Sequence, residues 1–361
     1  MKIEVYSPTI RRKEMDAVLT AMVEEKIGVG ERNRLLIHTA KEQVKFDYAL
    51  ALRSPAVALH LALKALNAVP GQAVIVSALS PRYYFQVLED MRLTCLFCDV
   101  SYDSPCMSAE MIERVIAEKK AGLEICAIVL HHTLGFLPDT RAVAELGIPV
   151  IEDISQSYGS HFNTGEKKDN ESGENEKNEK REEAQAKRGV FCILGLEERD
   201  MLTSGGGALL FAMNRRDGNL LRNFSGIADV YCLADINASL AVVQFKEVLR
   251  NIERRRDIAR VYTQASLRTR HKRFVPLVEN EYNNYAFSLV LETGLKDVIA
   301  YARKKDIVIE NAFENTAAGA GLCSGCPVSN SLVLRTVLFP MFPRLRLKDV
   351  ESVSRLIMTL P

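Results

Sequence analysis

The sequence has almost no excess of charge of either sign. Its 47 lysines and arginines nearly balance its 46 aspartates and glutamates, which leaves a formal net charge of +1. Without a basic field, a protein cannot hold nucleic acid or anionic lipid by charge alone. We therefore predict no nucleic-acid partner.

The sequence also lacks a long apolar run. Arg11, Arg12, Lys13 and Glu14 interrupt the first apolar stretch, and nothing later approaches the roughly 20 apolar residues that span a bilayer. This pattern predicts neither a secretory signal nor a membrane segment. We expect a cytoplasmic protein with no membrane partner.

A disulfide framework is not expected either. Without a secretory signal, the eight cysteines favour free thiols in a reducing compartment. They include two C-x-x-C pairs, Cys95/Cys98 and Cys323/Cys326. The first pair lies in an apolar run typical of a strand, where side chains three residues apart point to opposite faces and cannot chelate together. We favour ordinary thiols of the core and loops over a zinc site.

Strand and helix patterns alternate along most of the chain, which is long enough at 361 residues for two domains. Amphipathic segments separate the apolar runs AVIVSAL (73–79), LTCLFCDV (93–100), ICAIVL (125–130) and IPVIED (148–153). Such alternation predicts an α/β fold, with a mostly parallel sheet that helices cover on both faces and ligands at the carboxyl ends of its strands. We place this large domain at residues 1–240 and a smaller C-terminal α+β domain at 241–361.

One segment of the large domain has the composition of a loop. Residues 163–188, NTGEKKDNESGENEKNEKREEAQAKR, contain no apolar residue larger than alanine. Such a segment cannot offset its ordering entropy by burial. We predict a disordered charged insertion, and a tail that folds on a binding partner is the alternative.

Several stretches together resemble the DegT/DnrJ/StrS family of nucleotide-sugar aminotransferases, which are fold-type I enzymes that use pyridoxal phosphate. They occur in the family's order along nearly the whole chain: RSPAVALHLAL (53–63), IEDISQSYG (151–159), CLADINAS with a later run of three arginines (232–239 and 254–256), and FPMFPRL (339–345). The resemblance implies a fold-type I transferase-like large domain. It also implies a homodimer in which each cofactor site uses both subunits.

The resemblance assigns four residues to the cofactor site. Asp153 stands where a carboxylate partners the pyridine nitrogen, and Gln156 stands beside the ring oxygen. Ser54 falls in the phosphate-binding motif, and His132 matches a histidine common in the family. Three of the four have an ordinary alternative, because a strand-end aspartate caps turns, a loop glutamine is usually solvated and a structural histidine donates to a carbonyl.

The lysine that such an enzyme needs is missing. Residues 189–208 align without gaps on the family's lysine segment, and Arg199 stands at the lysine position. No lysine lies between Lys187 and Lys246, so a shifted alignment does not restore one. A guanidinium stays protonated, whereas lysine can shed its proton and attack an aldehyde. Arg199 therefore cannot form the Schiff base.

The phosphate site has lost its donors as well. The resemblance places Pro55 and Ala56 at the family's Gly-Thr pair, Leu194 at its serine, and Val230 at the asparagine that the partner subunit supplies. Proline has no amide hydrogen to donate to a phosphate. Pro81 replaces the aromatic cover of the ring, and one of residues 83–85 (YYF) is a possible substitute.

We interpret the chain as a degenerate aminotransferase homologue without transaminase activity or a bound cofactor. Its remaining role would be to bind a nucleotide sugar or to assist an active paralogue. The alternative is an active aminotransferase of surface polysaccharide biosynthesis that uses pyridoxal phosphate or pyridoxamine phosphate and a lysine from elsewhere, such as Lys246. A third hypothesis is a pure interaction protein that acts through residues 163–188.

The insertion leads to a first prediction. Deleting residues 163–188 and joining Phe162 to Gly189 through a short linker should leave the melting temperature nearly unchanged, because so polar a segment buries little apolar surface. Differential scanning calorimetry of both chains checks this. A large drop in melting temperature would show that the segment packs against the protein.

Overall fold

The computed structural model describes residues 2–119, 121–161, 189–224, 227–275, 280–292 and 294–361. The insertion expected at 163–188 lies outside the described residues.

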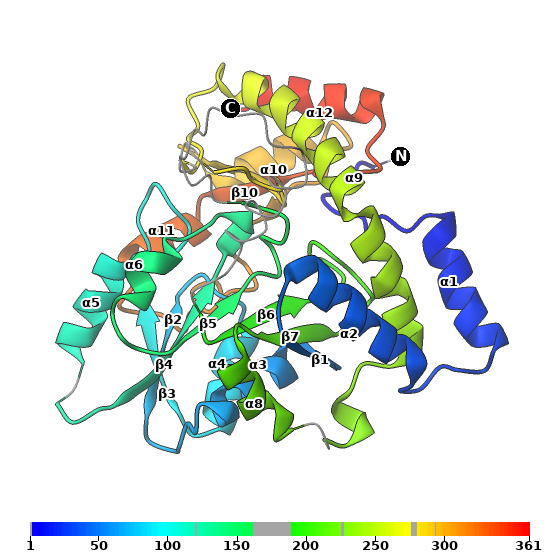
Figure 1. Ribbon diagram of the computed structural model, residues 1–361. Coiled ribbons are helices and arrows are strands. Elements are labelled where there is room, and N and C mark those ends of the chain that lie inside the picture. The colour runs from blue at the N-terminus through cyan, green and yellow to red at the C-terminus, as the bar shows by residue number, and fades with distance from the viewer. Residues whose placement is uncertain (1, 120, 162–188, 225–226, 276–279, 293) are drawn as a thin grey trace, which may run out of the picture.

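A seven-stranded sheet forms the centre of the larger part of the molecule (Figure 1). Its strand order is β1-β7-β6-β5-β4-β2-β3. Strands β3, β2, β4, β5 and β6 run parallel, whereas β7 is antiparallel to both β6 and β1. The strands are β1 (Tyr48–Leu52), β2 (Ala73–Ser77), β3 (Thr94–Cys98), β4 (Ile125–His131), β5 (Val150–Asp153), β6 (Phe191–Gly195) and β7 (Ala208–Ala212). The mostly parallel sheet predicted from the sequence is confirmed.

Helices cover both faces of this sheet. On one face, α3 (Pro55–Ala65), α4 (Tyr83–Asp90) and α8 (Arg215–Arg222) pack on alternate strand residues such as Leu210. On the other face, α2 (Glu31–Val44) and α9 (Asp235–Ser266) pack on Leu209 and Phe211, and α5 (Ala109–Glu118) and α6 (Thr140–Ala144) cover β2 to β5. Successive strand residues thus enter different cores, which is why these strands are apolar throughout.

A second, three-stranded antiparallel sheet forms the smaller part, in the order β8-β10-β9. Its strands are β8 (Phe287–Val290), β9 (Glu310–Asn311) and β10 (Thr336–Phe339), and α10 (Leu295–Arg303) and α12 (Leu347–Met358) pack against them. The remaining elements are α1 (Arg12–Val23), α11 (Pro327–Val333) and the 3-10 turns η1 (Thr133–Gly135) and η2 (Asp229–Tyr231).

Helix α9 joins the two parts, as Figure 1 shows. Its first half supplies Phe245 to the core of the large sheet, and its second half supplies Tyr262 to the core of the small sheet. Ile3, near the N-terminus, also pairs with Ile307 in the smaller part. The boundary expected near residue 240 therefore falls within a continuous helix, and it stays a prediction. No helix of the described residues is both long and apolar enough to cross a membrane.

Candidate functional site

Asp153 ends β5 at the carboxyl edge of the parallel strands, and it is 1% exposed. The hydroxyls of Tyr83 and Tyr84 donate to its Oδ2 atom at 3.1 and 2.5 Å. The backbone N–H and the hydroxyl of Ser155 donate to its Oδ1 atom at 3.0 and 2.5 Å. Both oxygens of the buried carboxylate therefore accept two hydrogen bonds each from the protein itself.

The two tyrosines reach Asp153 because they open helix α4. Their rings meet edge to face with centroids 4.8 Å apart, and the ring of Tyr84 also contacts the His131 ring at the end of β4. Burial, and then the negative charge of Asp153, raise the pKa of both phenols. The two hydroxyls consequently stay protonated and act as donors to the carboxylate.

Ser155 connects Asp153 to the end of β6. Its Oγ atom accepts a hydrogen bond from the Gly195 N–H at 2.7 Å. A Cβ atom at Gly195 would collide with the carboxylate of Asp200 and approach Ser155 Oγ to 2.8 Å, so only glycine fits here. Asp200 is itself held by the Glu197 N–H at 2.9 Å, and burial raises its pKa to about 8.

Arg199, where the resemblance predicts the lysine of the family, contacts the small sheet. Its guanidinium forms two hydrogen bonds to the Glu310 carboxylate in β9, at 2.6 and 3.2 Å, and lies over the Tyr6 ring at 6.0 Å. The bond to Glu310 raises the pKa of Arg199 further. The side chain is 55% exposed and permanently charged. It offers an ion pair and no nucleophile.

His132 directly follows β4, and its Nδ1 atom forms a hydrogen bond whereas its buried Nε2 atom forms none within the described residues. Its Nδ1 atom is 2.7 Å from Ser157 Oγ, and its Nε2 atom is 3.4 Å from a carboxylate oxygen of Glu152. The other Glu152 oxygen accepts the Gly189 N–H at 2.7 Å. All three side chains are at most 2% exposed. This buried chain ties the ends of β4, β5 and β6 together.

Gln156 and Ser54 support local backbone rather than a common pocket. The Gln156 side chain accepts the Leu134 N–H at 2.6 Å, and it thereby holds a residue with φ of 55°. Ser54 caps helix α3 by accepting the Val57 N–H at 3.3 Å, and Pro55 occupies the first helical position. The start of α3 therefore has few amide hydrogens left for an anion.

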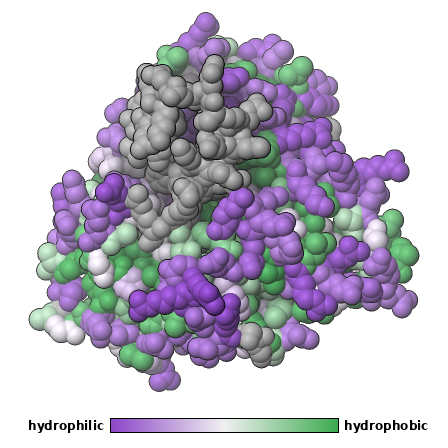
Figure 2. Space-filling view, viewed as in Figure 1, coloured by the Kyte–Doolittle hydropathy of each residue, from purple (hydrophilic) through white to green (hydrophobic). Residues whose placement is uncertain are grey.

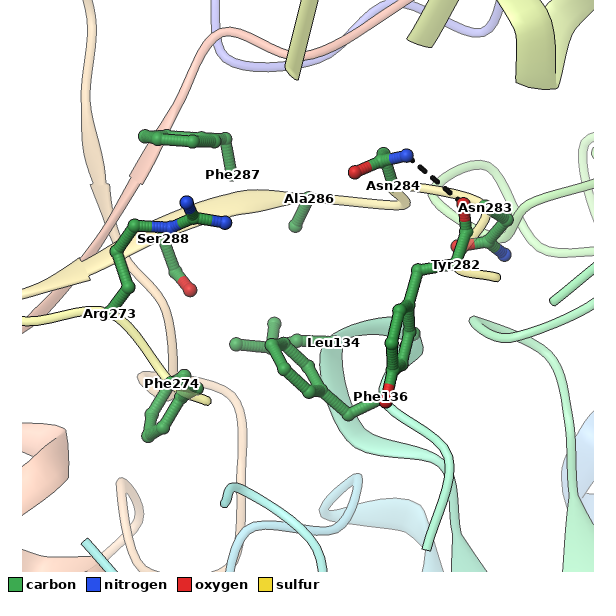
Figure 3. Close-up of a pocket in the computed structure, with 11 residues that line it drawn as sticks. Leu134, Phe136, Arg273, Phe274, Tyr282, Asn283, Asn284, Ala286, Phe287 and Ser288 are labelled. Carbon is green, nitrogen blue, oxygen red and sulfur yellow. Dashed lines mark hydrogen bonds between the residues drawn. The ribbon is translucent and has the colours of Figure 1, made fainter. Parts of the chain in front are cut away.

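A small cavity of about 70 Å³ lies where the loop after β4 meets residues 273–274 and 282–288 (Figure 3). The Phe136 ring faces those of Phe274 and Tyr282, with centroids 5.8 and 5.5 Å away. In Figure 3, the guanidinium of Arg273 points toward this cavity from the side opposite Tyr282. Arg273 donates to the Thr263 hydroxyl, and none of the described acidic side chains pairs with it.

The sequence did not reveal three residues that matter here, which are Tyr83 and Tyr84 as donors and Glu310 as the partner of Arg199. The only signal for the first two is a pair of tyrosines at the start of an amphipathic segment. Nothing in the sequence indicates Glu310, which lies 111 residues from Arg199. Phe85 turns away and stacks on Phe97 instead.

The chain matches the model of the DegT/DnrJ/EryC1/StrS aminotransferase family over residues 8–175 and 210–358. The L-glutamine:2-deoxy-scyllo-inosose aminotransferase of Streptomyces fradiae is 30% identical over 214 residues, which make up 58% of this chain and 44% of that protein. The match thus spans less than half of that relative's length.

Solved structures share the whole fold at low sequence identity. A protein from Streptococcus pneumoniae, provisionally assigned as a sugar aminotransferase and solved in apo-, PLP- and PMP-forms, superposes with a TM-score of 0.84. Its apo-form is 16% identical, with 99% of this chain and 97% of that chain covered. The aminotransferase TlmJ from Streptoalloteichus hindustanus is 19% identical, with a TM-score of 0.83 and coverage of 99% and 98%. The fold is thus that of fold-type I aminotransferases.

Because His131 is buried, we predict that the free energy of unfolding depends on pH. Burial lowers the pKa of His131 from 6.5 to about 4, against the opposing charge of Asp153, so the folded protein keeps the ring neutral. The unfolded chain takes up this proton as the pH falls through 6.5, and folding stability is then lost. Between pH 7 and pH 5 the loss from this group should be about 2 kcal/mol.

Urea unfolding at pH 7 and pH 5 measures this contribution. His131→Asn should reduce the difference in unfolding free energy between the two pH values, whatever it does to stability at pH 7. His38→Asn is the matched control, because the His38 side chain is 68% exposed and should leave the difference unchanged. If His131→Asn and the unaltered protein lose the same unfolding free energy between pH 7 and pH 5, His131 is not the source of the loss.

Proposed function

This chain belongs to the DegT/DnrJ/EryC1/StrS aminotransferase family, and we propose that within it the protein is a degenerate member that does not transaminate. Its role is to hold a carbohydrate ligand of the nucleotide-sugar class, or to assist an active paralogue, in the biosynthesis of polysaccharides in the cytoplasm. The similarity to the GDP-perosamine synthase of Escherichia coli O157:H7, which is 30% identical over 165 residues, supports the ligand class.

The observation that carries the proposal is the saturation of Asp153. In a pyridoxal phosphate enzyme, this carboxylate must accept a hydrogen bond from the protonated pyridine nitrogen. Here Tyr83, Tyr84 and Ser155 already provide four donors to its two oxygens. A cofactor ring would have to displace the half-buried phenol of Tyr83 and the buried phenol of Tyr84, and leave their hydroxyls without this acceptor. The residues present therefore do not fit the cofactor.

The chemistry at position 199 supports the same conclusion. Pyridoxal phosphate enzymes activate an amine that loses its proton, whereas Arg199 carries a delocalised charge that Glu310 stabilises further. The bidentate ion pair also holds the guanidinium toward the small sheet.

The phosphate donors are absent from the expected positions. Pro55 has no N–H, and the Val57 N–H is already bonded to Ser54 Oγ. Leu194 is a fully buried core residue, and Val230 is an apolar side chain that is 65% exposed. Phosphate binding relies on amides and hydroxyls that converge, so these positions provide little to hold the group.

We predict that the protein forms no internal aldimine. After incubation with excess pyridoxal phosphate and reduction with borohydride, mass spectrometry should find no stoichiometric adduct on a single lysine. The absorbance spectrum should lack the yellow band of an aldimine. A stoichiometric adduct on one lysine, together with amino transfer to a keto-sugar nucleotide, would promote the active aminotransferase instead.

Arg199→Lys serves as the matched variant in the same experiment. Restoring the amine should not restore transamination, because Asp153 remains occupied and the phosphate donors remain absent. A transaminase activity gained by this single substitution would show that the rest of the site is intact.

We also propose a homodimer. Helix α1 packs on α9 and carries a stripe of apolar side chains on its other side, at the helical spacing 15, 19, 22 and 23. These side chains of Met15, Leu19, Met22 and Val23 are between 54% and 76% exposed. Figure 1 places α1 at the outer edge of the molecule, and Figure 2 shows hydrophobic residues at that edge. A second copy of the chain would cover such a stripe.

A second apolar surface supports the same assembly. A cavity of about 380 Å³ opens beside α3, and Val57, Leu61, Phe224 and Ile227 are among the residues that line it. Tyr231, on its rim, is 52% exposed. Two separate apolar surfaces of this kind favour burial in an assembly over permanent contact with water.

Light scattering tests the dimer. Leu19→Glu combined with Met22→Glu should convert a dimer into a monomer, because it would bury two unpaired charges. Leu267→Glu is the control, since Leu267 is 80% exposed at the far end of α9 and its change should leave the mass unaltered. Chelator and reductant together should also leave the mass unaltered, because we expect no metal or disulfide in the interface. If the unaltered protein is already a monomer in solution, the homodimer proposal is wrong.

A further inference from the structure

The second C-x-x-C pair forms the two ends of a surface turn. Ser324 and Gly325 are exposed at its tip, and Cys323 and Cys326 lie beneath them at 3% exposure each. In a four-residue turn the Cα atoms of the first and last residues are less than about 7 Å apart. That separation overlaps the range in which two cysteines can form a disulfide.

Asn330, one turn into α11, fixes both ends of this turn. Its side-chain amide donates to the Cys323 carbonyl at 2.8 Å, and its backbone N–H donates to the Cys326 carbonyl at 3.0 Å. Gly325 has no heavy atom within 4 Å of the place where a Cβ would stand, so the tip has room to adjust. These two hydrogen bonds thus hold both ends of the turn in place.

The segments on both sides of the turn are anchored to the large domain. Before it, the Ala318 N–H donates to the Ala78 carbonyl at 2.9 Å. After it, Asp99 accepts the N–H groups of Val328 and Ser329 at 2.9 and 2.8 Å. Hydrogen bonds to the larger part of the molecule therefore hold the chain on both sides of the turn.

The two thiols differ in acidity. The neighbouring Cys323 thiol lowers the pKa of Cys326, and Cys326 in turn raises the pKa of Cys323. The other six cysteines have a raised pKa, chiefly through burial, and for Cys95 and Cys98 it reaches about 12. A thiolate, rather than a thiol, attacks an oxidant.

We propose that Cys323 and Cys326 form a reversible dithiol–disulfide centre that a hydroperoxide oxidises. The Cys326 thiolate attacks one peroxide oxygen, the O–O bond breaks, and the products are a sulfenic acid and water once the leaving oxygen takes a proton. The Cys323 thiol then attacks the Cys326 sulfur, the S–O bond breaks, and the hydroxyl leaves as a second water molecule with the Cys323 proton. Two thiols and one hydrogen peroxide thus give one disulfide and two waters.

A metal site is the competing use of such a pair. Thiolate zinc sites need convergent ligands, commonly four of them. Within the described residues, no group of three or more His, Cys, Asp or Glu side chains is arranged to hold a metal ion. The geometry therefore favours two-electron oxidation within the turn, and this proposal is independent of whether the protein binds a cofactor.

Thiol mapping of the full-length protein tests the proposal. The protein is treated with a small excess of hydrogen peroxide, denatured, labelled with N-ethylmaleimide and digested. The peptide that contains residues 323–326 should lose both labels and two hydrogen masses, and dithiothreitol should restore them. In Cys323→Ser, Cys326 should instead accumulate a sulfenic acid that dimedone traps, which identifies the attacking sulfur even though no disulfide can form.

Cys232 provides the control, because it is more exposed than either member of the pair and its pKa is raised. Cys232→Ser should leave the disulfide yield unchanged. Three outcomes would overturn the proposal: oxidation of Cys232 before the pair, a disulfide from Cys326 to Cys95, or zinc retained on the pair in the purified protein.

Discussion

A carboxylate buried at the end of β5 needs hydrogen-bond donors, and much of the site follows from how Asp153 obtains them. An unpaired buried charge costs several kcal/mol, so the chain must provide donors wherever a ligand does not. Tyr83 and Tyr84 do so from the first turn of α4, and Ser155 does so from the turn after the strand. The Ser155 hydroxyl also accepts a hydrogen bond from the Gly195 N–H, so the hydrogen-bond network reaches β6. The site is thus closed by its own side chains.

The ion pair between Arg199 and Glu310 matters more for chemistry than for stability. Both side chains are partly exposed, at 55% and 33%, and such pairs typically contribute at most about 1 kcal/mol. The two parts of the molecule are held together more firmly by α9, whose buried Arg255 donates to the carbonyls of Tyr285 and Met341. Arg199 therefore provides no nucleophile, and its ion pair adds little to the stability of the fold.

The sequence predicts regular features better than it predicts side-chain direction. The alternation of apolar runs and helical segments was enough to predict the mostly parallel sheet. It also predicted that Asp153 ends a strand, because both features depend on local periodicity. The direction of Tyr83 and Tyr84 depends on where α4 begins. That start is fixed by contacts with residues far along the chain, such as the pairing of Pro81 with Thr316. No local pattern contains this information.

The motif IEDISQSYG shows why sequence resemblance exceeds chemical resemblance here. The Glu152 side chain accepts the Gly189 N–H, and the Asp153 carbonyl accepts the His132 N–H at 3.0 Å. Gln156 holds Leu134 in its left-handed conformation, and Ser157 contacts the His132 ring. Each of these polar residues satisfies a backbone group or a buried side chain that would otherwise be unpaired, at a cost of roughly 1–3 kcal/mol. Folding alone is therefore enough to explain these polar residues, so the motif identifies the scaffold and not the reaction.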